Sequence, residues 1–219
     1  MHRIFKAMKL DFFTARNALP FCLLAYALGI LLATLTKEPM ATFVIVMLLT
    51  VFMGGMIFST YEKSHSEKLY GILPLKRSEM IAGRYLYGLI IGLVNIVVAG
   101  VIAYVAMQFF DMTFSWFLYW GFAAIAFIYY CFATGFLYPI YFKFSFTKGY
   151  LYAMIPMILL GIGVMFFARK SDAMTAFNQF TQFFSDHLFL APLFGLVCGL
   201  VLLTISAVIS HLIYSHKEI

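Results

Sequence analysis

Six long apolar segments separated by short polar ones constrain this chain more than any other feature. They run approximately from Leu19 to Leu35, Met40 to Ser59, Ile81 to Met107, Phe114 to Phe142, Gly149 to Ala168 and Leu188 to Tyr214. Each is close to the ~20 residues that a helix needs to cross about 30 Å of hydrocarbon. With 64% hydrophobic residues, the chain also exceeds the apolar share of soluble domains, which is about half. The sequence predicts an all-α, polytopic membrane protein with six transmembrane helices in a single domain, residues 1–219.

Lysine and arginine are unevenly distributed over the polar segments, and this sets the expected orientation. One predicted side holds Arg3, Lys6, Lys9, Arg16, Lys63, Lys68, Lys76, Arg77, Arg84, Lys143, Lys148 and Lys217, and the other holds Lys37, Arg169 and Lys170. Because basic residues of short loops stay in the cytoplasm, both termini are expected on the cytoplasmic side of a bacterial membrane. The formal charge of +6 then reflects topology and attraction to anionic membrane lipids, and no nucleic-acid partner is expected.

Residues 1–18 predict an amphipathic helix at the membrane surface. Ile4, Phe5, Met8, Phe12 and Ala15 share one helical face, and basic side chains lie roughly opposite. The apolar face is expected to sink into the headgroup boundary, while the basic face meets anionic lipids. The alternative is a positively charged tail without stable structure.

Residues 169–187 form a second amphipathic stretch, on the predicted outer side. Its phenylalanines cluster on one helical face and its polar side chains on the other. A helix that lies along the outer membrane surface and gates an exit path has this pattern. The alternative is an external loop anchored by interfacial aromatic residues.

A charged stretch, residues 62–80, separates the second and third apolar segments. Ser64 and Glu67 have the spacing of a capping box, so a short helix is expected to begin there. Leucine and isoleucine then share one face until Pro74 ends the helix. Ser78 and Glu79 are expected to cap the next helix, which enters the membrane. The stretch is interpreted as a docking element for a soluble partner, and the alternative is an ordinary ordered loop.

Motifs for catalysis are missing. The sequence has no Gly-x-x-x-x-Gly-Lys-Ser/Thr motif for nucleotide phosphates and no His-Glu-x-x-His motif for zinc. Cys22, Cys131 and Cys198 are isolated from one another, without disulfide or zinc spacing. Asp186 and His187 are adjacent, but a solvated loop end explains them better than an acid/base pair. We therefore expect no catalytic residue, no metal site and no cofactor bound by this chain.

Polar residues deep in the apolar segments are few. Asn95, Cys131, Thr134 and Thr204 are the clearest, and hydrogen bonds between helices, worth about 0.6 kcal/mol each, are sufficient to explain them. Transporters that couple to protons or ions usually retain charged residues near the middle of their spans. The predicted spans of this chain carry none there.

Some side chains of the third and fourth apolar segments are candidates for a substrate path or a helix interface. These are Asn95, Phe127 and Tyr130. The aromatic content favours an apolar path for amphipathic cargo, and the alternative is ordinary packing or contact with lipid. Gly88 and Gly92 predict close packing of the third segment against another helix or a second subunit.

The charged stretch resembles the cytoplasmic segment between spans two and three of small type-two ABC exporter permeases. The matching residues are Leu73-Pro74, Arg77, Glu79 and Arg84-Tyr85. The six-span plan and the two amphipathic stretches extend the resemblance over the whole chain. What it implies is a coupling helix that docks on a separate ABC ATPase subunit through Ser64, Glu67, Lys68, Leu69, Tyr70, Ile72, Leu73 and Pro74.

The resemblance implies further partners. Lys143 and Lys148 would make a lesser second contact with the ATPase, and ATP and Mg would bind to that subunit. A second permease, identical or different, would complete the path. The function expected is that of a non-catalytic permease that exports a hydrophobic or amphipathic substrate. The alternatives are an ATP-independent channel or secondary carrier and, with less support, a membrane enzyme acting on lipid or peptide.

Overall fold

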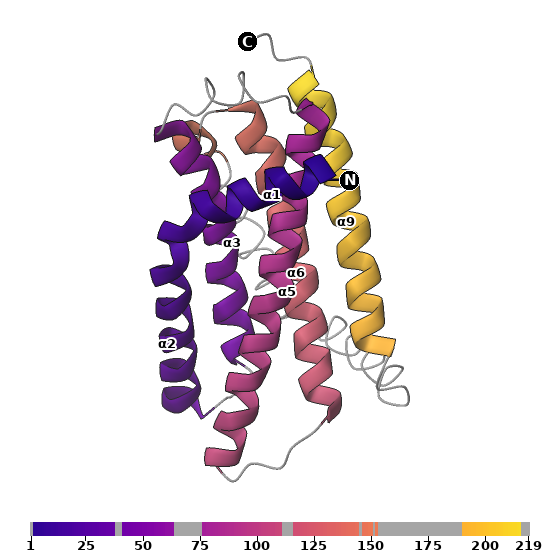
Figure 1. Cartoon of the computed structure of the whole chain (residues 1–219). Helices are drawn as coiled ribbons and strands as arrows, with labels where there is room; N and C mark the ends of the chain where they lie inside the picture. The colour runs from indigo at the N-terminus through magenta and orange to yellow at the C-terminus, as the bar shows by residue number, and fades with distance from the viewer. Residues whose placement is uncertain are drawn as a thin grey trace.

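The computed structural model describes residues 2–37, 41–63, 76–110, 116–144, 146–150, 152 and 190–215. These residues form helices and short turns, so the all-α prediction is confirmed for the described part of the chain. The elements are α1 (His2–Thr14), the 3-10 turn η1 (Ala15–Ala18), α2 (Leu19–Thr36), α3 (Ala41–Lys63), α5 (Arg77–Phe109), α6 (Trp116–Lys143) and α9 (Leu190–Ser215). Figure 1 shows α2, α3, α5, α6 and α9 side by side, with α1 crossing them nearer one end.

Among the described residues, four helical stretches are long and apolar enough to cross a membrane. They are Ile45–Lys63, Ser78–Phe109, Tyr119–Lys143 and Leu190–Ser215, and they correspond to the predicted second, third, fourth and sixth spans. The first predicted span is a shorter apolar helix, Pro20–Leu35, and the chain leaves α2 at Lys37 with a left-handed φ of 55°. Most of the fifth predicted span and all of residues 169–187 lie outside the described residues. Six spans therefore remain a prediction.

The end of the bundle at which α1 lies is also its basic end. There α3 and α6 end, α5 begins and α9 ends (Figure 1). The exposed residues Lys63, Lys76, Lys143 and Lys148 belong to it, and we call it the basic end below. At the opposite end, Lys37 is exposed. The sequence-based distribution of positive charge is thus reproduced in three dimensions for the described residues.

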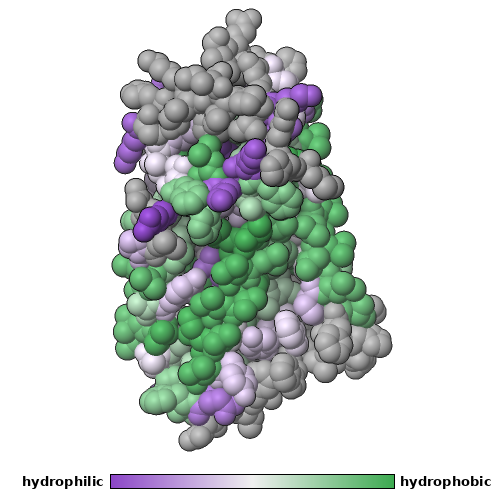
Figure 2. All heavy atoms as spheres, in the orientation of Figure 1, coloured by the Kyte–Doolittle hydropathy of each residue, from purple (hydrophilic) through white to green (hydrophobic). Residues whose placement is uncertain are grey.

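Apolar side chains cover the middle of the bundle on the face that Figure 2 shows, and hydrophilic residues gather mainly around α1. Many apolar residues of the long helices are exposed, among them Val97 at 63% and Val208 at 61%. Soluble monomers rarely leave such large contiguous apolar surfaces uncovered. The exposure is what a helix bundle surrounded by hydrocarbon requires.

Small residues bring the helices close together. A Cβ added at Gly195 of α9 would lie 2.9 Å from the Cβ of Ala124 of α6, so this pair of helices is in near-backbone contact. The predicted glycine contacts of the third span lie inside this chain: Gly88 faces the hydroxyl of Tyr138 and Gly92 faces the ring of Tyr130, both on α6. These glycines accommodate tyrosine side chains rather than a neighbouring backbone or a second subunit.

Two local expectations differ from the structure. The N-cap of α5 is Lys76, whose backbone N–H donates to Glu79 Oε2 at 2.9 Å, so Ser78 lies within the first turn and is not the cap. The hydroxyls of Thr134 and Thr204 donate to carbonyls of their own helices rather than across the bundle. A threonine hydroxyl can bond its own helix backbone without a partner helix, which is why these two residues were poor guides to helix contacts.

Candidate functional site

The predicted coupling helix, from Ser64 to Leu73, lies outside the described residues, as does Pro74, so its role stays a prediction. The structure does describe what flanks it: the end of α3 on one side and the start of α5 on the other. The described part of the candidate site therefore consists of these two flanks and of the residues that contact them.

The end of α3 is bonded to the segment that follows α6. Glu62 accepts two hydrogen bonds from Thr147, one from the backbone N–H and one from the hydroxyl, both at 3.3 Å. Thr147 belongs to a helical turn at 146–150, and Lys143 and Lys148 beside it are exposed. The end of α3, which precedes the predicted coupling helix, thus lies beside the segment that carries Lys143 and Lys148, the predicted second contact.

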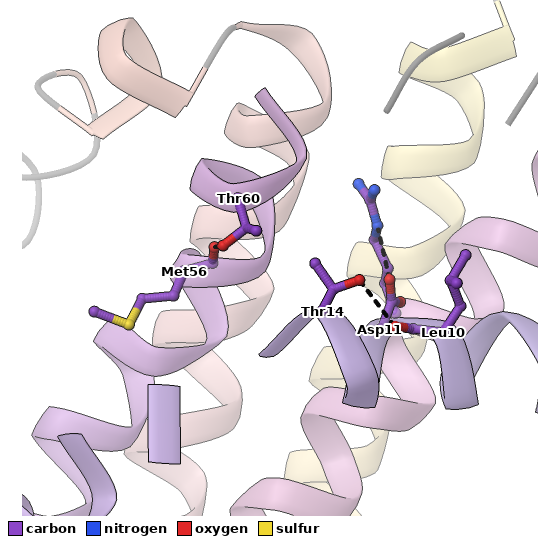
Figure 3. Close-up of polar contacts among 6 residues, drawn as sticks. Leu10, Asp11, Thr14, Met56 and Thr60 are labelled. Atoms are coloured by element: carbon purple, nitrogen blue, oxygen red, sulfur yellow. Dashed lines mark hydrogen bonds and ion pairs between the residues drawn. The ribbon is translucent and has the colours of Figure 1, made fainter. Parts of the chain in front are cut away.

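The start of α5 carries a buried arginine in an aromatic box. The guanidinium carbon of Arg84 lies 4.6 Å from the ring centroids of both Phe58 and Tyr61 and 5.4 Å from that of Phe142. Its Nε lies 4.0 Å from Oδ1 of Asp11 on α1, and both side chains are 3% exposed. Figure 3 draws this ion pair as a dashed line from Asp11, beside the bond from the Thr14 hydroxyl to its own helix. Arg84 therefore joins α5 to α1, α3 and α6.

Burial makes the groups around the Arg84 guanidinium important for the stability of the fold. An unpaired charge in an apolar interior is strongly unfavourable, so the guanidinium requires its counter-charge. Faces of aromatic rings add up to about 2 kcal/mol when the cation is desolvated. Within the described residues no acceptor reaches Nε or one of the terminal nitrogens of Arg84. Asp11 and the three rings are thus the groups that stabilise the charge.

The next residue ties the same turn of α5 to α9. The hydroxyl of Tyr85 lies 2.6 Å from the Ser206 hydroxyl and 2.8 Å from that of Ser210. Ser206 in turn donates to the carbonyl of Gly135 on α6. These buried groups make a continuous hydrogen-bonded link from α5 through α9 to α6. The Arg-Tyr pair at the end of the charged stretch is therefore a junction between helices.

The three candidates for a path or an interface lie at two places. Tyr130 is fully buried, and its hydroxyl donates to the Gly88 carbonyl at 2.6 Å. Phe127 is buried where α6 packs on α9, and Asn95 accepts a hydrogen bond of 2.7 Å from the Tyr26 hydroxyl. Phe127 and Tyr130 thus pack within this chain, while Asn95 lies at a cavity that is described below.

Sequence reasoning missed Asp11 and the serine pair on α9. The apolar face predicted for residues 1–18 shares only Ala15 with the side that is buried. The buried residues there are Ala7, Asp11 and Ala15. These residues follow one another at intervals of four, which places them on one helical face. A single acid between two alanines, in a helix otherwise rich in basic residues, was the available signal.

Metal chemistry finds no support in the described part of the chain, where no three His, Cys, Asp or Glu residues gather into a possible ion site. Cys22, Cys131 and Cys198 are free thiols. The described residues form a helical integral membrane protein, and polar contacts join its helices at the basic end.

Comparison with known proteins identifies the family of this membrane protein. The model of the ABC-2 family transporter protein matches residues 8–215, nearly the whole sequence. The chain belongs to this family, and it is a permease subunit of an ABC transporter: the non-catalytic membrane component, with ATP hydrolysis in a separate subunit. A comparison with curated proteins found no match. The resemblance seen in the charged stretch is thus confirmed at the level of the family.

Proposed function

We propose that this permease works in an exporter and couples to its ATPase through residues 64–73 at the basic end, which faces the cytoplasm of a bacterium. It forms half of the translocation path and pairs with a second permease. Closure of two ATPase subunits on ATP and Mg pushes the coupling helices and rocks the two bundles, so that a cavity between them opens alternately to each side.

One observation carries this proposal: both flanks of the predicted coupling helix are joined to other helices. Glu62 at the end of α3 binds Thr147 after α6. Arg84 and Tyr85 at the start of α5 reach α1 and α9. A displacement of the segment between α3 and α5 is thereby transmitted to the rest of the bundle. A coupled permease needs such a connection to move its helices together.

The proposed cargo is hydrophobic or amphipathic. Size and composition resemble a permease subunit of the staphylococcal exporter of phenol-soluble modulins, so cytolytic amphipathic peptides are the class to test first. Because Phe127 and Tyr130 are buried inside this chain, the path would be lined by surfaces that a second permease completes.

Substitutions in the coupling helix test the proposal. In inverted vesicles that contain the permeases and their ATPase, Glu67→Lys or Leu73→Asp is expected to reduce ATP-dependent uptake of a labelled amphipathic peptide to background. Both residues lie in a polar stretch between apolar segments, so the amount of folded protein in the membrane should not change. Uptake is the measurement, normalised to the protein level.

Lys37→Glu is the matched control, because it also changes a charge but lies at the opposite end of the bundle. It should transport as the native protein does. If both coupling variants keep full uptake, the assignment of this segment is wrong. If Lys37→Glu loses uptake equally, the effect belongs to charge in general rather than to the docking surface.

A further inference from the structure

A cavity of about 830 Å³ lies between α1, α2 and α5. The volume is in the range of small-molecule sites. α1 contributes Phe5, Met8, Lys9 and Phe12, α2 contributes Cys22, Leu23 and Tyr26, and α5 contributes Tyr87, Ile90, Ile91, Val94 and Asn95. Its walls are almost entirely apolar, and the permease function described above does not use it.

The cavity extends inward from the basic end. α1 crosses α5 at Gly83, where an added Cβ would lie 2.8 Å from that of Ala7. From Tyr87 to Asn95 the wall on α5 rises about 12 Å, at 1.5 Å per residue. α1 crosses the bundle nearer its basic end (Figure 1). With α1 at the membrane surface, as the sequence predicts, the cavity would start near headgroup level and reach toward the hydrocarbon layer.

The polar groups at the inner part of the cavity are already paired with each other. Tyr26 donates to Asn95 Oδ1 at 2.7 Å, and Asn95 Nδ2 donates to the carbonyl of Ile91 at 2.9 Å. An extended peptide would bring backbone N–H and C=O groups that need partners in such surroundings. A hydrocarbon chain needs no hydrogen bond and fits.

The one charged residue that lines the cavity, Lys9, is basic and exposed. Lys6 and Arg16, elsewhere on α1 and η1, are exposed as well. The one acid of these two elements, Asp11, is buried against Arg84 and does not line the cavity. The charge that α1 brings to the cavity is therefore positive, which complements an anionic headgroup.

We propose that this cavity is a binding site for an anionic phospholipid, with an acyl chain between α1, α2 and α5 and the phosphate group at Lys9. The site rests on the position of the chain in a membrane and not on the transport function proposed above. Bound lipid would fill the space under α1 and fix this helix against the bundle.

The test is retention of lipid by the purified protein, measured by native mass spectrometry in mild detergent with phosphatidylglycerol or phosphatidylcholine added. The native protein is expected to retain phosphatidylglycerol in preference. Lys9→Glu should weaken that preference about fivefold or more, since one basic residue near anionic lipid is worth about 1 kcal/mol. Val94→Trp and Leu23→Trp, which fill the cavity from opposite walls, should abolish retention of either lipid.

Val101→Trp is the matched control, because Val101 lies two turns further along the same face of α5, is 57% exposed and does not line the cavity. It should retain lipid as the native protein does. Equal retention by the cavity-filling variants and this control would overturn the site. Equal binding of both lipids, unchanged by Lys9→Glu, would overturn the anionic headgroup. Loss of a dimer with lipid unchanged in Val94→Trp and Leu23→Trp would show that the cavity is a subunit contact instead.

Discussion

Replacing Asp11 by alanine is expected to destabilise the folded protein by about 3–5 kcal/mol, because it leaves the Arg84 guanidinium buried without its counter-charge. Arg84 is 2% exposed and enclosed by the rings of Phe58, Tyr61 and Phe142, so water cannot replace the carboxylate without opening the box. The measurement is unfolding of the purified protein in mixed micelles with increasing sodium dodecyl sulfate, followed by circular dichroism.

The partner variants separate the ion pair from simple loss of a side chain. Arg84→Met together with Asp11→Leu should be less destabilising than Asp11→Ala alone, since apolar residues of similar volume often replace a buried pair at little cost. Lys6→Ala, on the exposed side of α1, should have no measurable effect. If Asp11→Ala unfolds at the same detergent concentration as the native protein, or if the effects of the pair simply add, the buried charge is not what holds α1.

Gly92→Ala is the second substitution with a large expected effect, a loss of about 1–3 kcal/mol from overpacking. The new methyl group would overlap the ring of Tyr130, which is fully buried and whose hydroxyl is held by the Gly88 carbonyl at 2.6 Å. The ring therefore cannot move aside without losing that hydrogen bond. The same micelle unfolding experiment measures the change.

Gly121→Ala provides the control on the partner helix. A Cβ there meets nothing within 4 Å, so the substitution should be neutral or stabilise by up to about 1 kcal/mol through helix propensity. Equal stability of Gly92→Ala and Gly121→Ala would contradict the close packing of α5 on α6. A loss in both would point to a general intolerance of alanine rather than to Tyr130.

The helices themselves were predictable because a membrane demands long apolar segments. The boundaries of α3, α5, α6 and α9 follow from where apolar residues give way to charged ones such as Lys63 and Lys143. The start of α5 was predicted two residues late, because a backbone N–H, not a serine side chain, is the group that Glu79 satisfies. Glu79 accepts from the backbone N–H of Lys76, and this bond does not depend on which side chain the cap residue carries. The residue type at the cap therefore gave no signal.

The junction at the basic end was predictable only in part. The sequence pattern singled out Arg84 and Tyr85 but not their partners, which lie far away in the chain on α1 and α9. Ser206 and Ser210 lie in an apolar segment where isolated hydroxyls are common, and nothing local distinguishes them. Which helix lies next to which depends on tertiary packing, so the partners of a buried polar group emerge only with the fold.

A permease coupled to a separate ATPase subunit should associate with that subunit in the membrane. The most direct measurement is co-purification: the tagged protein is isolated from native membranes in mild detergent, and the ATPase activity of what accompanies it is assayed, alongside Glu67→Lys and Leu73→Asp. We expect an associated, active ATPase that is lost in both variants. Recovery of the permease alone, stable and able to move substrate down an ion gradient, would contradict this expectation and establish a secondary carrier or channel.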